Sequence, residues 1–339
     1  MSQESTPVVK SGNAGLQLCE NAMDEVYRFK EVLGLDVIIW TPPPLSTPWK
    51  RHLLTDGVAI INFLSMYAET HSKDYLSLAT TLATLTHLIL ADSSAVKGLK
   101  LSGGVIWIFA LGRLSLATDN ADWLDLAVQV ANDLFSDAEH RGIARIGGKS
   151  PRKSPHKSPE DDLQSIIDKG HDIGLMGTYY IGVVTKILLF SAELLNHKQS
   201  RLLNLVYRTT GSLQSKEHLL HLEDPLDAGF ALWISHFNPD GVMEKQLVQD
   251  ALSIFEGCLP EGKDGSLDLD TTKHTAISSF AMSIGLKCSK TSFWTSLVAD
   301  KLVTFWEKKA DVWAVGKDRS ETAIVMYAAA VAPRVFNRE

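Results

Sequence analysis

Ionisable and polar side chains stand immediately before, or in the first turn of, several strongly apolar segments of this 339-residue chain. The set comprises Asp56, Ser102, His171 with Asp172, Asp224 with Asp227, Asp270 with His274, and Arg319 with Glu321. Carboxylates and imidazoles are the groups that most often exchange protons with a substrate. Acids at the same positions also suit helix N-caps, so each has a catalytic and a structural interpretation.

We predict that six of these residues are catalytic, as acid, base or orienting groups: His171, Asp172, Asp224, Asp227, His274 and Glu321. Asp56 and Arg319 are assigned to substrate binding. For any single acid the N-cap interpretation is favoured over the catalytic one. The two histidines are less natural caps, so for them the structural interpretation and a role in a site stand about equal.

Aromatic residues near the starts of the apolar segments are predicted to line a substrate pocket: Trp107, Tyr179, Tyr180, Trp233 and Tyr327. Packing in the hydrophobic core is the alternative for each of them. Mostly apolar walls with a few convergent polar groups favour a small, largely hydrophobic substrate.

Metal and cofactor motifs give little support to a prosthetic group. His218 and His221 are spaced i, i+3 near Glu223, but no third ligand follows at a recognised spacing. Cys19, Cys258 and Cys288 form no C-x-x-C pair, and their sparse number suits a reducing compartment. No phosphate loop, dinucleotide fingerprint, nucleophile elbow or H-E-x-x-H is present, and Gly103-Gly104 is better explained by close helix packing. We expect neither metal nor cofactor.

Composition limits the class of protein. Apolar residues make up 45% and charged residues 22%, which is typical of a folded globular protein. The net charge of −7 provides no global positive field for nucleic acid. The longest apolar runs, such as 105–111 and 187–192, are much shorter than the ~20 residues of a membrane span. The N-terminus has no apolar secretory segment, so we expect a cytoplasmic protein; the sequence does not indicate its oligomeric state.

An internal repeat defines the elements that must position these residues. Residues 74–79 read Asp-Tyr-Leu-Ser-Leu-Ala and residues 122–127 read Asp-Trp-Leu-Asp-Leu-Ala, an offset of 122 − 74 = 48. Each of these repeated segments is predicted to begin an amphipathic helix. Each follows a segment, 56–70 or 102–118, that is apolar on most sides. Each unit is therefore predicted to be a buried inner helix, a short turn and an amphipathic outer helix.

The same pair of an inner helix and an outer helix is predicted again further along the sequence. Inner-type segments are 174–195, 226–237, 275–286 and 322–332, and outer-type segments begin at 201, 243 and 293. The first segment, Leu16–Leu33, and the last have no sequential partner. If these two pair, twelve helices form six hairpins in a closed ring, and residues 1–339 make one domain.

Three stretches fall outside this pattern. We expect a flexible N-terminus over 1–14 and a stiff proline-rich connector over 41–48. Residues 145–162 contain three Ser-Pro pairs and are predicted to be a disordered insertion. A tolerated surface insertion is favoured over a lid or a phosphorylated tether.

The segment from Gly112 to Ala127 (GRLSLATDNADWLDLA) resembles the hairpins of the (α/α)6 toroid superfamily. That superfamily includes six-hairpin glycosidases, lanthionine-synthetase-like proteins and terpenoid-cyclase-type barrels. The resemblance implies an all-α (α/α)6 barrel with a funnel lined by the inner-helix starts. The zinc motifs of lanthionine synthetases and the Asp-rich motif of squalene cyclases are absent. Fungal-type mannanases of this fold use an adjacent Asp-Asp pair, and the one such pair in this sequence, Asp161-Asp162, lies at the edge of the insertion.

The main functional expectation is a cofactor-independent enzyme that acts on a small hydrophobic metabolite. Its reaction would be a pericyclic or cationic cyclisation, an isomerisation or an elimination. The first alternative is a glycoside hydrolase or uronate lyase of the six-hairpin type, and the second is a non-catalytic scaffold or binding protein. A closed apolar cavity favours the enzyme of hydrophobic metabolites, and a groove with two carboxylates favours the glycoside hydrolase or lyase. A ring filled by side chains favours the scaffold or binding protein.

Overall fold

The structure is a computed structural model, and it describes most of the helical part of the chain. The described residues are 14–34, 40–43, 53–92, 101–145, 175–198, 200–213, 222, 225–238, 241–256, 275–289, 293–309 and 321–337.

Twelve α-helices and no strand occur in these described ranges. The helices are α1 (Ala14–Tyr27), α2 (Leu53–Thr70), α3 (Lys73–Asp92), α4 (Leu101–Thr118), α5 (Ala121–Arg145), α7 (Leu175–Leu194), α8 (Ser200–Leu213), α9 (Pro225–Ser235), α10 (Val242–Glu256), α11 (Ala276–Ser289), α12 (Phe293–Lys308) and α14 (Glu321–Val331). Two short 3₁₀ helices, η1 (Lys30–Val32) and η5 (Arg334–Phe336), complete the elements.

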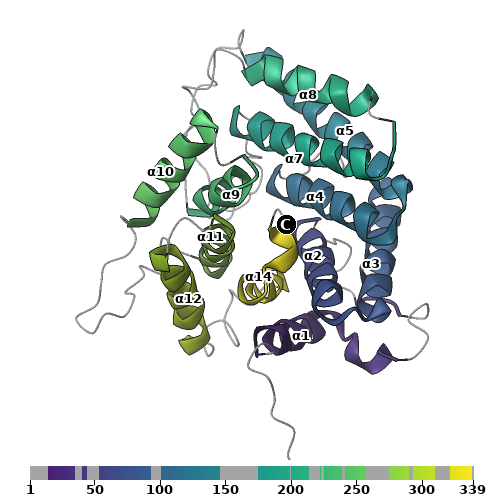
Figure 1. Cartoon of the computed structure of the whole chain (residues 1–339), viewed down its shortest axis with the longest axis vertical. Coiled ribbons are helices and arrows are strands. Elements are labelled where there is room, and N and C mark those ends of the chain that lie inside the picture. Colours follow the sequence, from purple (N-terminus) through teal and green to yellow (C-terminus); the bar gives the residue numbers. More distant parts are fainter. Residues whose placement is uncertain are drawn as a thin grey trace, which may run out of the picture.

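The helices form six hairpins around a centre, as the sequence predicts (Figure 1). The inner helices are α2, α4, α7, α9, α11 and α14, and each packs against the inner helix on either side. Helix α1 packs against α14, which joins the two ends of the chain into the last hairpin and closes the ring. Both the all-α class and the closing pair are therefore confirmed.

Inner and outer helices differ in burial as their patterns indicate. Helix α2 is buried on every side from Leu53 to Met66, apart from the partly exposed Leu54. Outer helix α8 buries only Leu202, Leu205, Thr209 and Leu213, at spacings of three and four residues. One hydrophobic core includes side chains from all twelve described helices. Burial of this apolar surface is the main force that holds the ring together.

Glycines allow some inner helices to approach very closely. A Cβ on Gly285 of α11 would lie 2.5 Å from the carbonyl oxygen of Gly229 on α9. A Cβ on Gly103 of α4 would lie 3.1 Å from the backbone nitrogen of Leu54 on α2. The prediction that Gly103 serves helix packing is confirmed.

The first helix is shorter than the predicted 16–33. Helix α1 ends at Tyr27 because Arg28 takes a left-handed φ of 48°. The carboxylate of Asp24 then accepts a hydrogen bond from the Lys30 amide at 2.8 Å, which supports η1 after the break.

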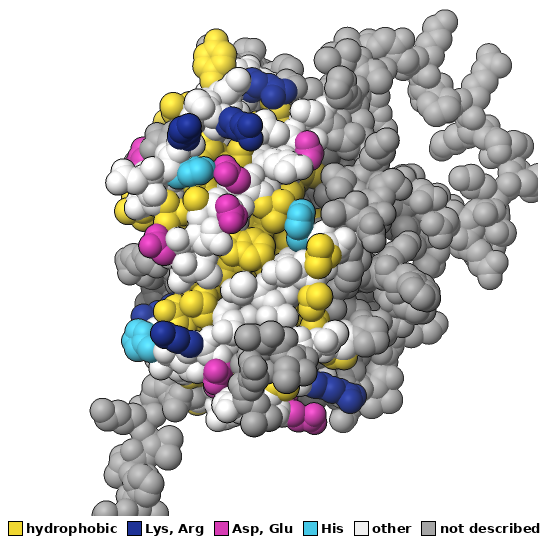
Figure 2. All heavy atoms as spheres, turned by 90° about the vertical axis from the view of Figure 1, so that its right-hand side faces the viewer, with side chains coloured by type: hydrophobic (Ala, Val, Ile, Leu, Met, Phe, Trp, Pro, Cys, Tyr) yellow, Lys and Arg dark blue, Asp and Glu magenta, His cyan; other side chains and the backbone are white. Residues whose placement is uncertain are grey.

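The outer surface carries mixed side chains. Figure 2 shows a face on which hydrophobic groups are interspersed with Lys, Arg, Asp, Glu and His. Among the described helices, none is both long and apolar enough to cross a membrane.

Candidate functional site

The ring has two unequal ends. Every inner helix except α14 ends in a short connection to the outer helix that follows it, such as residues 71–72 between α2 and α3 or 119–120 between α4 and α5. The inner helices begin at the opposite end, after the longer connections. A site on this fold can therefore form at the turn end or at the end where the inner helices begin.

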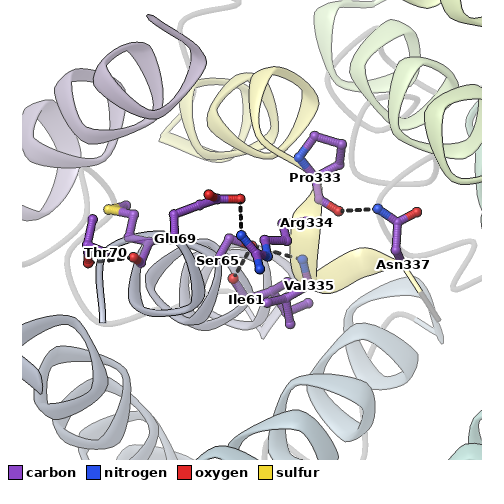
Figure 3. A network of polar contacts seen from close by, with 9 residues as sticks. Ile61, Ser65, Glu69, Thr70, Pro333, Arg334, Val335 and Asn337 are labelled. Carbon is purple, nitrogen blue, oxygen red and sulfur yellow. Dashed lines mark hydrogen bonds and ion pairs between the residues drawn. The ribbon is translucent and has the colours of Figure 1, made fainter. Parts of the chain in front are cut away.

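The turn end is filled by the C-terminal segment, residues 333–337 (Figure 1). Its Val335 amide donates to Ser65 Oγ at 3.1 Å, and Ser65 donates in turn to the Ile61 carbonyl at 2.9 Å. Arg334 pairs with Glu69 in the last turn of α2 (Figure 3). These contacts fix the segment to α2.

Aromatic side chains join the same segment to α4 and α9. Phe336 lies 6.0 Å from Trp233 and 6.4 Å from Phe109, measured between ring centroids. Phe109 and Trp233 themselves meet edge to face at 5.0 Å. The four aromatic rings here, counting Phe237 at 5.7 Å from Phe109, make the turn end a packed aromatic cluster.

Arg113 is the charged residue of this cluster. Its guanidinium lies 5.1 Å from the centroid of the Phe109 ring and donates to the carbonyl of Asn337. Burial lowers the pKa of Arg113 to about 10. Sequence reasoning missed Arg113, although a single arginine within an otherwise apolar inner helix is a recognisable signal.

The inner-helix starts carry three described carboxylates, the buried Asp56 of α2 and two others. Asp227 lies in the first turn of α9, and Glu321 begins α14. Both are partly exposed. The hydroxyl of Tyr180 on α7 donates to the Asp227 carbonyl at 3.3 Å, which ties the starts of α7 and α9 together. The Thr55 and Thr322 hydroxyls share a 2.6 Å hydrogen bond between α2 and α14.

Asp56 faces the outer helices. It is fully buried, and its two carboxylate oxygens accept hydrogen bonds from the Tyr27 hydroxyl of α1 and the Thr86 hydroxyl of α3, each at 2.9 Å. The carboxylate therefore joins three helices at a distance from the centre of the ring. Its role in substrate binding stays a prediction, and these two protein partners provide a structural role.

The predicted aromatic residues do not gather around one space. Trp233 is in the turn-end cluster, and Tyr327 donates at 2.7 Å to Glu307 on outer helix α12. Trp107 is fully buried on α4, one turn after Gly103, whose Cβ position faces Leu54 of α2. Tyr180 is linked to the starts of the inner helices through the main-chain carbonyl of Asp227.

Tyr179 is buried where α7 approaches α10. Burial raises the pKa of Tyr179 far above its ordinary value, and the nearby Glu244 carboxylate raises it further. Glu244 is itself 4% exposed and lies in the first turn of α10. The Tyr179 hydroxyl therefore lies near Glu244 of outer helix α10 and Ser235 at the end of inner helix α9.

Five predicted site residues lie outside the described residues: His171, Asp172, Asp224, His274 and Arg319. His218 and His221 lie outside them as well. Within the described ranges, no group of three or more His, Cys, Asp or Glu side chains is arranged to hold a metal ion.

Comparisons with known proteins identify the fold of the chain but no family. No family model matches the chain, and no curated protein matches it. The solved structure of an unsaturated glucuronyl hydrolase specific for heparin superposes with a TM-score of 0.54 and 10% sequence identity. The match covers 94% of this chain and 96% of that one. It shows that the six hairpins form an (α/α)6 toroid along nearly the whole chain.

Proposed function

We propose that this chain is an enzyme that cleaves a glycosidic bond, as a hydrolase or a uronate lyase of the six-hairpin type. One observation carries the proposal: Asp227 and Glu321 stand in the first turns of two inner helices, at the end of the ring opposite the C-terminal segment. The toroid likeness to a glucuronyl hydrolase supports it at the level of the fold. This function is the first alternative drawn from the sequence.

The chemistry needs two carboxyl groups with different tasks. In hydrolysis one gives its proton to the glycosidic oxygen as the anomeric carbon–oxygen bond breaks. The other takes a proton from the attacking water, whose oxygen joins the anomeric carbon, or attacks that carbon itself. In a lyase, a base instead removes the proton beside the uronate carboxylate as the bond to the leaving oxygen breaks.

Asp227 and Glu321 are suited to the ionised role, since the positive end of a helix dipole stabilises a carboxylate. Asp172 and Asp224 precede the starts of α7 and α9 in the sequence by three residues and one residue. With His171 and His274 they stay predicted members of the site and are candidates for the proton donor.

Turnover of a glycoside panel tests the proposal. The panel contains 4-nitrophenyl glycosides of neutral and uronic sugars and a disaccharide with an unsaturated uronyl end. We expect one of these to be cleaved, and Asp172→Asn, Asp227→Asn or Glu321→Gln to lower kcat by about 10²–10⁴. Asp133→Asn, on the exposed face of outer helix α5, is the matched control and should keep full activity. Absence of cleavage across the panel would overturn the proposal.

A second candidate is the cyclase, isomerase or eliminating enzyme favoured by the sequence. Its supporting observation is that the inner helices begin with partly exposed apolar side chains, Leu54 on α2 and Leu226 on α9 among them. Metabolite identification after gene deletion tests it, and an accumulated uncyclised precursor is the expected result. An inactive panel together with an unchanged metabolite profile would leave the scaffold alternative, which the filled turn end also suits.

A further inference from the structure

Four partly exposed apolar side chains stand within the first two turns of four inner helices. They are Leu54 on α2, Met176 on α7, Leu226 on α9 and Ile277 on α11, and all four pack against the hydrophobic core. Most apolar side chains further along these helices are buried. The four residues are therefore the outer edge of the core at the end where the inner helices begin.

Helical register places two of these residues on the central face of the ring. Leu226 precedes Trp233 by seven residues, which is close to two full turns, so both project from the same side of α9. Leu54 precedes Ser65 by eleven residues, or about three turns of α2. Trp233 and Ser65 both bond to the C-terminal segment in the centre of the ring. Leu54 and Leu226 hence face the same axis.

The two ends of the ring are separated along this axis. Seven residues of helix place Leu226 about 10 Å from the level of Trp233. At the level of Trp233 the aromatic cluster and Phe336 close the centre. The other end of the axis is the one at which the inner helices begin, and these apolar side chains and the acids Asp227 and Glu321 lie there.

We infer that Leu54, Met176, Leu226 and Ile277 form a subsite for a hydrophobic aglycone, so that the substrate class is a sugar joined to an alkyl or aryl group. The inference rests on the proposed function. Asp227 follows Leu226 directly on α9, so a sugar held at the carboxylates places its aglycone beside the apolar side chains. Removal of that aglycone from water stabilises the bound state in proportion to the apolar area covered.

Matched pairs of glycosides test the subsite. For the sugar that the panel identifies, kcat/KM for the octyl glycoside should exceed that for the methyl glycoside by about ten-fold or more. Leu226→Gln and Leu54→Gln should remove most of this preference, because kcat/KM for the octyl glycoside falls towards that for the methyl glycoside. Leu203→Gln, at an exposed apolar position of outer helix α8, is the control and should keep the preference.

Binding separates this inference from the proposed function. Octyl and methyl thioglycosides of glucose and of glucuronic acid resist hydrolysis, and calorimetry below the micellar concentration measures their affinity. Tighter binding of the octyl compounds that is lost in Leu226→Gln supports the subsite even if no glycoside is cleaved. Equal affinity of octyl and methyl compounds for the wild-type protein would overturn it, whether or not the panel shows turnover.

Discussion

The indole nitrogen of Trp233 donates a hydrogen bond of 3.1 Å to the main-chain carbonyl of Phe336. The two residues are 103 positions apart, and this bond joins inner helix α9 to the C-terminal segment. The Phe336 ring is 2% exposed and packs against the same indole. The segment is thus part of the core of the toroid.

Loss of the Phe336 side chain should destabilise the whole ring. We expect Phe336→Ala to lower the free energy of unfolding by about 3–5 kcal/mol, because a buried aromatic ring leaves a cavity among Phe109 and Trp233. Urea denaturation followed by tryptophan fluorescence measures it. Asn337→Ala, which keeps the ring and the main-chain carbonyls, is the control. A loss below 1 kcal/mol for Phe336→Ala would show that the segment is dispensable.

Asp56 should contribute to stability through its two hydrogen bonds. Asp56→Asn retains one acceptor oxygen and should cost about 1–3 kcal/mol, since one of the Tyr27 and Thr86 hydroxyls then faces the amide nitrogen and loses its acceptor. Tyr27→Phe and the double variant complete a mutant cycle. A coupling energy near zero between positions 27 and 56 would contradict the structural role.

Close contact of α9 with α11 should make Gly229 intolerant of a side chain. A Cβ there would lie 2.5 Å from the Ala281 carbonyl carbon, so Gly229→Ala must push two inner helices apart. We expect a loss of about 1–3 kcal/mol or more, measured by thermal and urea unfolding. Gly211→Ala on α8 is the matched control, because no atom lies within 4 Å of that Cβ. Its expected gain is up to ~1 kcal/mol from helix propensity.

The Cys19 thiol should make stability fall in strong alkali. Burial raises the pKa of Cys19 from 9.0 to about 12, with the Glu20 charge adding to the shift. The folded state therefore holds this proton more tightly than the unfolded state. The contribution of this thiol to the free energy of unfolding is fully present below about pH 9 and is lost as the pH rises towards 12. Urea unfolding between pH 8 and 10 should show a decline that is smaller in Cys19→Ala.

Thiol labelling gives an independent check of the same burial. Iodoacetamide at pH 8 should leave Cys19 unmodified in the folded protein and modify it after unfolding, as read by peptide mass mapping. Rapid labelling of Cys19 in the native protein would contradict the packed position of α1 against α14.

The twelve described helices and the pairing of sequence neighbours could be predicted from the sequence because both depend on local periodicity. The α1–α14 pair was predicted because these two helices have no sequential partner. The repeated segments that begin at Asp74 and Asp122 have apolar residues along one side, which indicates outer helices. Helices α2 and α4 have apolar residues on nearly every side, which indicates inner helices. The end of α1 was not predicted, because the left-handed residue that ends the helix is Arg28 and not a residue typical of turns, such as glycine or asparagine.

Rotation of each inner helix about its own axis was decided by the tertiary structure. A helix that is apolar all round, such as α2 or α4, carries no stripe that shows which side faces the centre. Contacts such as Gly104 against Leu134 fix that rotation and leave Asp56 with α1 and α3. Sequence alone therefore determined which segments are inner helices of a closed ring. Only packing decided which of their side chains face its axis, and that the C-terminal segment fills one end.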